Sequence, residues 1–145
     1  MAVREWMTSD PVTVTPSDRV AEARQLMHRY GIRHLPVVED DGRLVGIVSD
    51  RDVRIDEAAL ARMTAVSIAV LAEAVGDERS IEAVMSASPH VIHVDEPVEA
   101  AARLMLSRRV SALPVIDDDH TLVGVITSTD CLLASLSRQD VGGTA

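Results

Sequence analysis

The chain lacks several residue types on which common functions depend. It has no phenylalanine, one tryptophan and one tyrosine, so the side chains that stack on unpaired nucleic-acid bases are almost absent. All 14 basic residues are arginine, which excludes a P-loop lysine and a Schiff-base lysine. The single cysteine, Cys131, has no intrachain partner and fits a reducing compartment.

Long apolar runs and a positive charge balance are missing as well. The net charge is −9, which repels extended polyanions, so we expect no nucleic-acid partner. No apolar signal segment follows residues 1–5, and residues 64–75 are about half the length that spans a bilayer. The hydrophobic content of 47% nevertheless predicts a packed aliphatic core. We expect a soluble, cytoplasmic protein with no membrane partner.

The strongest pattern in the sequence is a duplication. Residues 7–52 align with residues 85–130 at a constant offset of 78, without a gap and with fifteen identical positions. A match of this length predicts two copies of one supersecondary unit that pack against each other. Any ligand is then expected at the junction of the copies or in a pair of equivalent clefts.

Each copy is predicted to have the order β-α-β-β-α, which gives an α/β (α+β) fold of two repeats with pseudo-two-fold symmetry. In the first copy, Ser17 or Asp18 is expected to cap a helix that runs to Tyr30 and stops at Gly31. The last two strands form a hairpin, and a further helix begins near Asp50 and near Ser128. The expected strands are residues 11–16, 34–39 and 44–49, then 91–94, 113–117 and 122–127, with the second-copy helix at 96–108.

The sequence also suggests how the chain is divided. Residues 1–55 form the first repeat and residues 79–138 the second. Residues 56–78 carry apolar side chains at helical spacing and are predicted to be a helical connector. Residues 139–145 are predicted to be a flexible tail.

Candidate ligand-binding residues lie in the second strand of each hairpin and just after it, in the pattern Gly-x-x-(Ser/Thr)-x-x-Asp. Gly46, Ser49 and Asp52 in the first copy match Gly124, Thr127 and Asp130 in the second. Glycine permits a close approach to the backbone, and the hydroxyl lies at a strand-to-helix turn whose amides can receive phosphate. The aspartate can accept hydrogen bonds from a ribose diol. The alternative is that each Ser/Thr-x-x-Asp is simply a helix capping box.

Both copies resemble the cystathionine beta-synthase (CBS) domain, and the pair resembles a Bateman module. The signatures are Met7 with Pro11, the strands at residues 34–38 and 112–116, and the two Gly-x-x-(Ser/Thr)-x-x-Asp segments. The resemblance implies a regulatory module that binds AMP, ADP, ATP or S-adenosylmethionine in clefts between the repeats. It implies no obligatory cofactor, Mg²⁺ as a companion of a polyphosphate ligand, a homodimer, and an effector protein of unknown identity.

The resemblance also assigns roles to individual residues. Asp52 and Asp130 are expected to hold the ribose, while Ser49 and Thr127 contact phosphate or ribose. In the first copy, basic residues at the start of the second strand are expected to face phosphate, whereas the second copy has small side chains there. The remaining site residues are Arg33 and His34 for phosphate, Ser111 and Ala112 at the matching positions, and Val12, Ile32, His90 and Val110 around the adenine.

Other functions find less support in the sequence. The five histidines show no H-x-x-x-H or cysteine-paired spacing, so no metal site is expected. No nucleophile motif is present, so we expect no catalytic residue and no enzyme activity; a small hydrolase or transferase lacks a supporting constellation. The main alternative is a ligand-free dimerisation or protein-interaction module. In that case Gly46 and Gly124 serve packing, and Asp52 and Asp130 serve only as caps.

Overall fold

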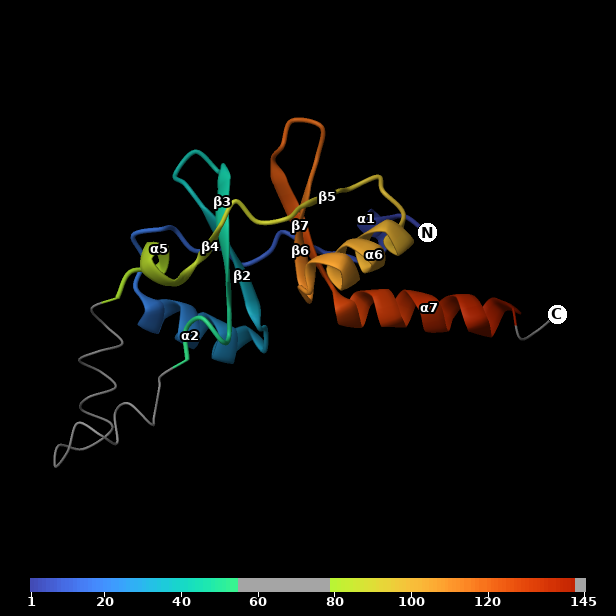
Figure 1. The fold of residues 1–145 in the computed structure, drawn as a ribbon, viewed down its shortest axis with the longest axis horizontal. Coiled ribbons are helices and arrows are strands. Elements are labelled where there is room, and N and C mark those ends of the chain that lie inside the picture. The colour runs from blue at the N-terminus through green and yellow to red at the C-terminus, as the bar shows by residue number, and fades with distance from the viewer. Residues whose placement is uncertain (55–78, 143–145) are drawn as a thin grey trace, which may run out of the picture. The chain divides into compact units, whose positions relative to one another are not determined.

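The computed structural model describes residues 1–54 and 79–142, and they form two compact units. Unit 1 consists of Met1–Pro11 and Pro89–Ala145, and unit 2 of Val12–Ser88 (Figure 1). The predicted connector, residues 56–78, lies outside the described residues.

The described residues of unit 2 form two helices and a small antiparallel sheet. The helix α2 spans Val20–Tyr30, and the hairpin strands β2 and β3 span His34–Val38 and Leu44–Ser49. The short helix α5 (Ile81–Val84) and the strand β4 (Ser86–Ala87) complete the unit, with strand order β2-β3-β4. Val14 makes a parallel bridge to Val37 and stands where a first strand was predicted, so this strand is reduced to a single bridge.

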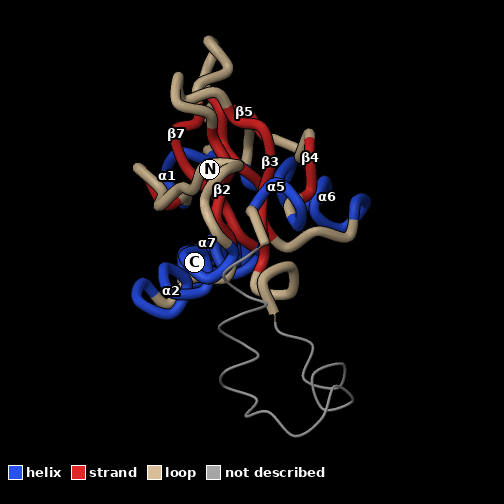
Figure 2. Tube along the Cα trace, turned by 90° about the vertical axis from the view of Figure 1, so that its left-hand side faces the viewer, coloured by secondary structure: helices blue, strands red, loops and turns tan. Residues whose placement is uncertain are grey.

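Unit 1 repeats the hairpin and its helix, and it also contains the strand β5 and the final helix α7. Its sheet has the order β1-β7-β6-β5, in which only β5 and β6 run parallel. Strands and helices can be told apart by colour in Figure 2. The elements are α1 (Val3–Trp6), β1 (Thr8–Ser9), β5 (Ile92–His93), α6 (Val98–Arg108), β6 (Ala112–Ile116), β7 (Leu122–Thr127) and α7 (Ser128–Gly142).

The start of each sequence copy pairs with the sheet of the other copy. Thr8 in β1 pairs with Val125 in β7, and Ser86 in β4 pairs with Ile47 in β3. The sequence did not predict this crossing, because α1 and α5 are single turns too short to show helical periodicity. Each compact unit is consequently assembled from both copies.

Each unit has its own aliphatic core. Leu35 on β2 of unit 2 is fully buried, and its counterpart Leu113 on β6 of unit 1 is fully buried as well. The segments that begin each copy, which contain α1 and β1 in the first and α5 and β4 in the second, are called the crossing segments. They contribute Ile81 to the unit 2 core and Val3 to the unit 1 core. Cys131 is partly buried and packs against the unit 1 core.

The predicted cap of α2 is wrong. Its N-cap is Arg19, without a side-chain hydrogen bond, and the Asp18 carboxylate instead accepts the Thr15 N–H at 2.8 Å. The first helical amide, of Val20, donates to the Arg79 carbonyl at 3.0 Å. In unit 1 the Val98 amide likewise donates to the Met1 carbonyl at 2.9 Å. A backbone carbonyl from the crossing segment thus satisfies a donor that a side-chain cap would otherwise serve.

The predicted end of α2 at Gly31 is confirmed. Gly31 has φ +64°, and its N–H donates to the Met27 carbonyl. The same position in the second copy is Arg109, which has φ +56° and donates to Met105. In the hairpin turns, Gly42 at φ +86° corresponds to His120 at φ +60°. The second copy therefore places non-glycine residues at both of these left-handed positions.

Candidate functional site

The end of β3 in unit 2 brings Ser49 and Asp52 into direct contact. Asp52 Oδ2 accepts hydrogen bonds from the Ser49 N–H at 2.8 Å and from Ser49 Oγ at 3.1 Å. The Asp52 N–H in turn donates to Ser49 Oγ at 3.4 Å. This reciprocal pattern is the capping box that the sequence offered as one of two interpretations.

Unit 1 repeats the pattern where β7 leads into α7. Asp130 Oδ2 accepts from the Thr127 N–H at 2.8 Å and from Thr127 Oγ1 at 3.0 Å. Both aspartates use Oδ2 alone, and Oδ1 of each makes no hydrogen bond within residues 1–54 and 79–142. A carboxylate can accept several hydrogen bonds, so the capping box leaves acceptor capacity on both residues.

Two basic residues lie beside the capping box of Ser49 and Asp52. His34 opens β2 and stands directly opposite Ser49 in the antiparallel register. Next to it, the Arg33 carbonyl accepts the Asp50 N–H at 2.9 Å, which holds the start of β2 against the turn after β3. The Arg33 side chain is exposed. The structure therefore brings Arg33, His34, Ser49 and Asp52 together in one unit.

The electrostatic environment of His34 is mixed. Burial is the largest influence and lowers its pKa from the usual 6.5. The Asp50 carboxylate opposes that shift, Arg33 adds to it, and Asp52 opposes it. The net direction is downward, so the neutral imidazole is favoured in the folded chain.

The matching positions of unit 1 have the same backbone arrangement without the basic side chains. Ala112 stands opposite Thr127, and the Ser128 N–H donates to the Ser111 carbonyl at 2.9 Å. Ala112 is buried and Ser111 is exposed. The difference predicted from the sequence is thus placed at structurally equivalent points of the two units.

The four residues predicted to surround adenine differ in burial. Val12 and Ile32 are partly buried and pack against the unit 2 core. In unit 1, Val110 is 37% exposed and His90 is exposed. The apolar part of the predicted site is therefore better formed in unit 2, and the adenine-binding role of all four residues stays a prediction.

In each Gly-x-x-(Ser/Thr)-x-x-Asp segment, a methionine side chain of the same chain lies against the glycine. A Cβ on Gly46 would lie 2.6 Å from Met85 Sδ, and a Cβ on Gly124 would lie 2.6 Å from Met7 Sδ. The sequence did contain a signal for this packing, because Met7 and Met85 are identical positions of the repeat.

Comparison with known families and relatives gives matches over most of the chain. The family model described as "CBS domain" matches residues 3–55 and 81–137. Inosine-5'-monophosphate dehydrogenase of Methanocaldococcus jannaschii is 34% identical over 129 residues, which is 88% of this chain and 22% of that protein. L-aspartate semialdehyde sulfurtransferase of the same organism is 30% identical over 128 residues, again 88% and 22%. The chain spans about a fifth of the length of these curated relatives.

Solved structures of similar size match more completely. CBSX2 in complex with AMP has a TM-score of 0.74 and 30% identity, with 95% of this chain and 98% of that chain covered. CBSX2 is a CBS-pair protein of Arabidopsis thaliana. The CBS domain pair of protein MJ0100, in complex with 5'-methylthioadenosine and S-adenosyl-L-methionine, has a TM-score of 0.72 and 30% identity, covering 100% and 98%. Among the described helices of this chain, none has the length and apolarity needed to cross a membrane.

Proposed function

Because this chain belongs to the CBS domain family and carries two CBS repeats, we propose that it is a regulatory module that binds an adenosyl ligand and has no catalytic activity of its own. The single observation that carries the proposal is the paired arrangement of Ser49 with Asp52 and Thr127 with Asp130. Each pair presents an aspartate whose Oδ1 accepts no hydrogen bond from the described part of the chain. CBS-pair structures that cover nearly all of this chain are complexes with AMP and with S-adenosyl-L-methionine.

Each proposed ligand position lies within one unit. Asp52 accepts the ribose hydroxyls through Oδ1, and Val12 and Ile32 contact the adenine. Arg33 supplies a guanidinium for phosphate, and its exposed side chain can reach a ligand without a large change of the backbone. In unit 1, Asp130 has the ribose role and Thr127 its neighbouring hydroxyl, with His90, Val110, Ser111 and Ala112 completing the position.

The charge difference between the units supports a preference for different ligands. Unit 2 offers Arg33 and His34 near the ligand, whereas unit 1 offers Ser111 and Ala112. Phosphate is a dianion, and the net charge of −9 makes local positive groups necessary for its binding. We expect AMP, ADP or ATP to favour unit 2, with Mg²⁺ accompanying a polyphosphate, and a ligand without phosphate, such as S-adenosylmethionine, to discriminate less.

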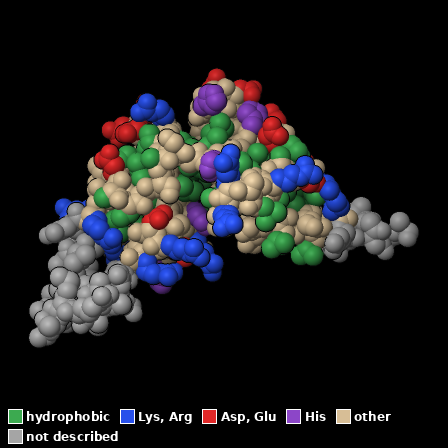
Figure 3. All heavy atoms as spheres, in the orientation of Figure 1, with side chains coloured by type: hydrophobic (Ala, Val, Ile, Leu, Met, Phe, Trp, Pro, Cys, Tyr) green, Lys and Arg blue, Asp and Glu red, His purple; other side chains and the backbone are tan. Residues whose placement is uncertain are grey.

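A homodimer is the second part of the proposal. Leu132, Leu133 and Leu136 of α7 are 65%, 51% and 56% exposed, and apolar side chains are visible along α7 in Figure 3. Adjacent exposed leucines on one helix are typical of a protein-protein contact. Sedimentation of the chain with and without a Leu133→Glu change tests this contact; a dimer that becomes a monomer supports it, and a wild-type monomer at all concentrations contradicts it.

Calorimetric titration with AMP, ADP, ATP and S-adenosylmethionine tests ligand binding. Asp52→Asn and Asp130→Asn are informative variants, because an asparagine oxygen keeps the cap acceptor while its amide nitrogen cannot accept a ribose hydroxyl. We expect micromolar to millimolar binding that each variant weakens at one position. No heat with any of the four ligands at millimolar concentration contradicts the proposal.

The ligand-free interaction module remains a second candidate on one observation. Both capping boxes are fully formed, and both glycines are packed by methionines of the chain, so fold stability alone explains these residues. This candidate predicts that Asp52→Ala lowers the free energy of unfolding while no adenosyl ligand raises the melting temperature of the wild type. A ligand-dependent rise in melting temperature distinguishes the two functions.

A further inference from the structure

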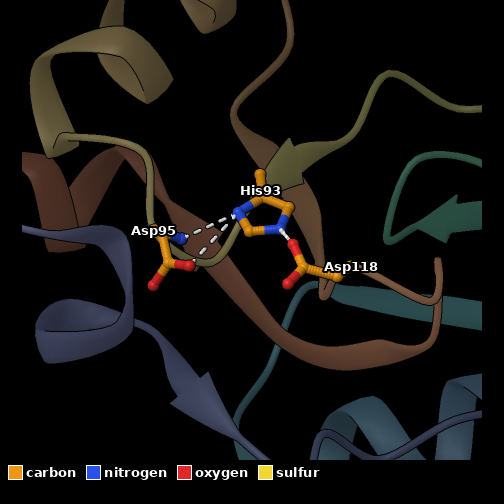
Figure 4. Close-up of side chains that lie close together, drawn as sticks. All are labelled: His93, Asp95 and Asp118. Atoms are coloured by element: carbon orange, nitrogen blue, oxygen red, sulfur yellow. Dashed lines mark hydrogen bonds and ion pairs between the residues drawn. The ribbon is translucent and has the colours of Figure 1, made fainter.

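Three polar side chains from two segments of unit 1 meet away from the proposed ligand residues. They are His93 on β5, Asp95 in the turn before α6, and Asp118 in the turn between β6 and β7 (Figure 4). One donor atom from each residue lies within 4.8 Å of the other two. No sequence motif joins all three residues, because folding brings Asp118 from a distant turn to the neighbouring pair His93 and Asp95.

The imidazole of His93 is held from both edges. The Asp95 N–H donates to His93 Nδ1 at 3.1 Å, and Asp95 Oδ2 lies 3.8 Å from the same nitrogen. On the other edge, His93 Nε2 lies 2.7 Å from Asp118 Oδ1. The His93 side chain is only 31% exposed, so the ring is confined on the surface of the unit.

The turn that carries Asp118 is fixed by its neighbour. Asp117 Oδ1 accepts the N–H groups of Asp119 at 2.9 Å and Thr121 at 3.0 Å, so this carboxylate is committed to the turn. Asp118 is 92% exposed and approaches only His93 among the described residues. Its carboxylate can therefore adjust its rotamer toward a shared ligand at little cost.

We propose that His93, Asp95 and Asp118 form a binding site for a transition-metal dication of the Zn²⁺ class. The donor set is one imidazole nitrogen and one oxygen from each carboxylate, with water completing the coordination. Zn²⁺ takes nitrogen and carboxylate ligands at about 2.0–2.2 Å. The ion binds at His93 Nε2, beside Asp118 Oδ1. The ring proton then lies on Nδ1, so the Asp95 N–H loses its acceptor there and the Asp95 carboxylate turns from the Nδ1 edge of the ring toward the ion. The imidazole nitrogen disfavours Mg²⁺ and Ca²⁺, which prefer oxygen alone.

The charge balance of the cluster fits a cation. Two carboxylates face the histidine, and the described charged group that opposes them is Arg4 of α1, which forms an ion pair with Asp95. A bound metal competes with Arg4 for the Asp95 carboxylate. The first copy has Thr15, Ser17 and Asp40 at the corresponding positions, so it has no equivalent of this site.

Titration of the purified full chain with ZnCl₂ against a chromophoric chelator tests the proposal, with MgCl₂ and CaCl₂ as comparison probes. We expect one Zn²⁺ per chain, at least tenfold weaker binding in His93→Gln and in Asp118→Asn, and little response to Mg²⁺ or Ca²⁺. Arg4→Gln is expected to tighten Zn²⁺ binding severalfold, because the competing cation is removed. A purely structural His93–Asp118 hydrogen bond predicts no such gain.

His28→Gln is the matched control, since His28 is an exposed histidine on α2. It should leave Zn²⁺ binding unchanged. Equal losses in His28→Gln and His93→Gln, or absence of saturable binding, overturn the proposal. Because Asp118 is so exposed, Asp118→Asn keeps the test valid even where His93→Gln proves less stable.

Discussion

Met7, from the start of the first copy, covers Gly124 in the second copy so closely that a Cβ on Gly124 would lie 2.6 Å from Met7 Sδ and 2.7 Å from the Thr8 carbonyl oxygen. Met85 has the same relation to Gly46, where the Ser86 carbonyl oxygen lies at 3.0 Å. At these two glycines, the segment that begins each copy packs directly against the sheet of the other copy. This packing accounts for two of the fifteen identical positions of the repeat, Met7/Met85 and Gly46/Gly124.

Gly124→Ala and Gly46→Ala are predicted to destabilise the fold. The added methyl group meets a backbone carbonyl, which cannot move as a flexible side chain does, and such overpacking costs about 1–3 kcal/mol. The shorter oxygen contact at Gly124 predicts the larger loss there. Urea unfolding measures both changes; unaltered stability in either variant contradicts the packing described.

Removal of residues 1–9 is predicted to loosen the second copy and leave the first copy intact. The deletion takes away β1, which pairs with β7, and Val3, which is fully buried in the unit 1 core. Hydrogen exchange followed by mass spectrometry should therefore speed up in β7 and remain slow in β3. Faster exchange in β3 instead would show that β1 pairs within its own copy.

The sequence predicted the central elements of each unit but not this pairing. The strands β2 and β3 were predictable from apolar β-branched residues between turn residues, and the end of α2 from Gly31. These patterns are local in the sequence. The edges at Gly46 and Gly124 are chemically alike, so no local property tells β1 which of them to join. The same distinction holds for the functional residues. The Ser49–Asp52 contact could be predicted, because it follows from a spacing of three residues. The cluster of His93, Asp95 and Asp118 could not, because the fold brings Asp118 to the other two residues.

Arg109→Gly is predicted to stabilise the protein. Arg109 adopts φ +56° at the end of α6, a conformation that costs an L-residue about 1 kcal/mol and costs glycine almost nothing. We expect a gain approaching that amount, reduced by the greater flexibility of glycine in the unfolded chain. Arg108→Gly, one residue earlier and inside the helix, is the control and should lower the free energy of unfolding by up to about 1 kcal/mol.

The stability of the chain is predicted to fall in mild acid through His34. Burial lowers the pKa of His34 below 6.5, so the unfolded chain binds a proton more readily than the folded chain. The free energy of unfolding should therefore decrease as the pH falls through the unfolded pKa of about 6.5, and level off below the folded pKa. His34→Ala, which copies Ala112 of the other unit, should flatten this part of the curve.

His28→Ala provides the comparison for that pH series, because His28 is exposed. Its pH profile should match the wild type. A wild-type slope that persists in His34→Ala would assign the pH dependence to another group.

The most direct test of the central claim is the AMP affinity of the Asp52→Asn, Asp130→Asn double variant, measured by calorimetry beside the wild type. Both capping hydrogen bonds can persist through the asparagine oxygens, so the melting temperature should stay close to that of the wild type. We predict that AMP binds the wild type and that the double variant loses at least tenfold in affinity. Equal AMP affinity of the folded double variant and the wild type would contradict the proposed ribose-binding role of the two aspartates.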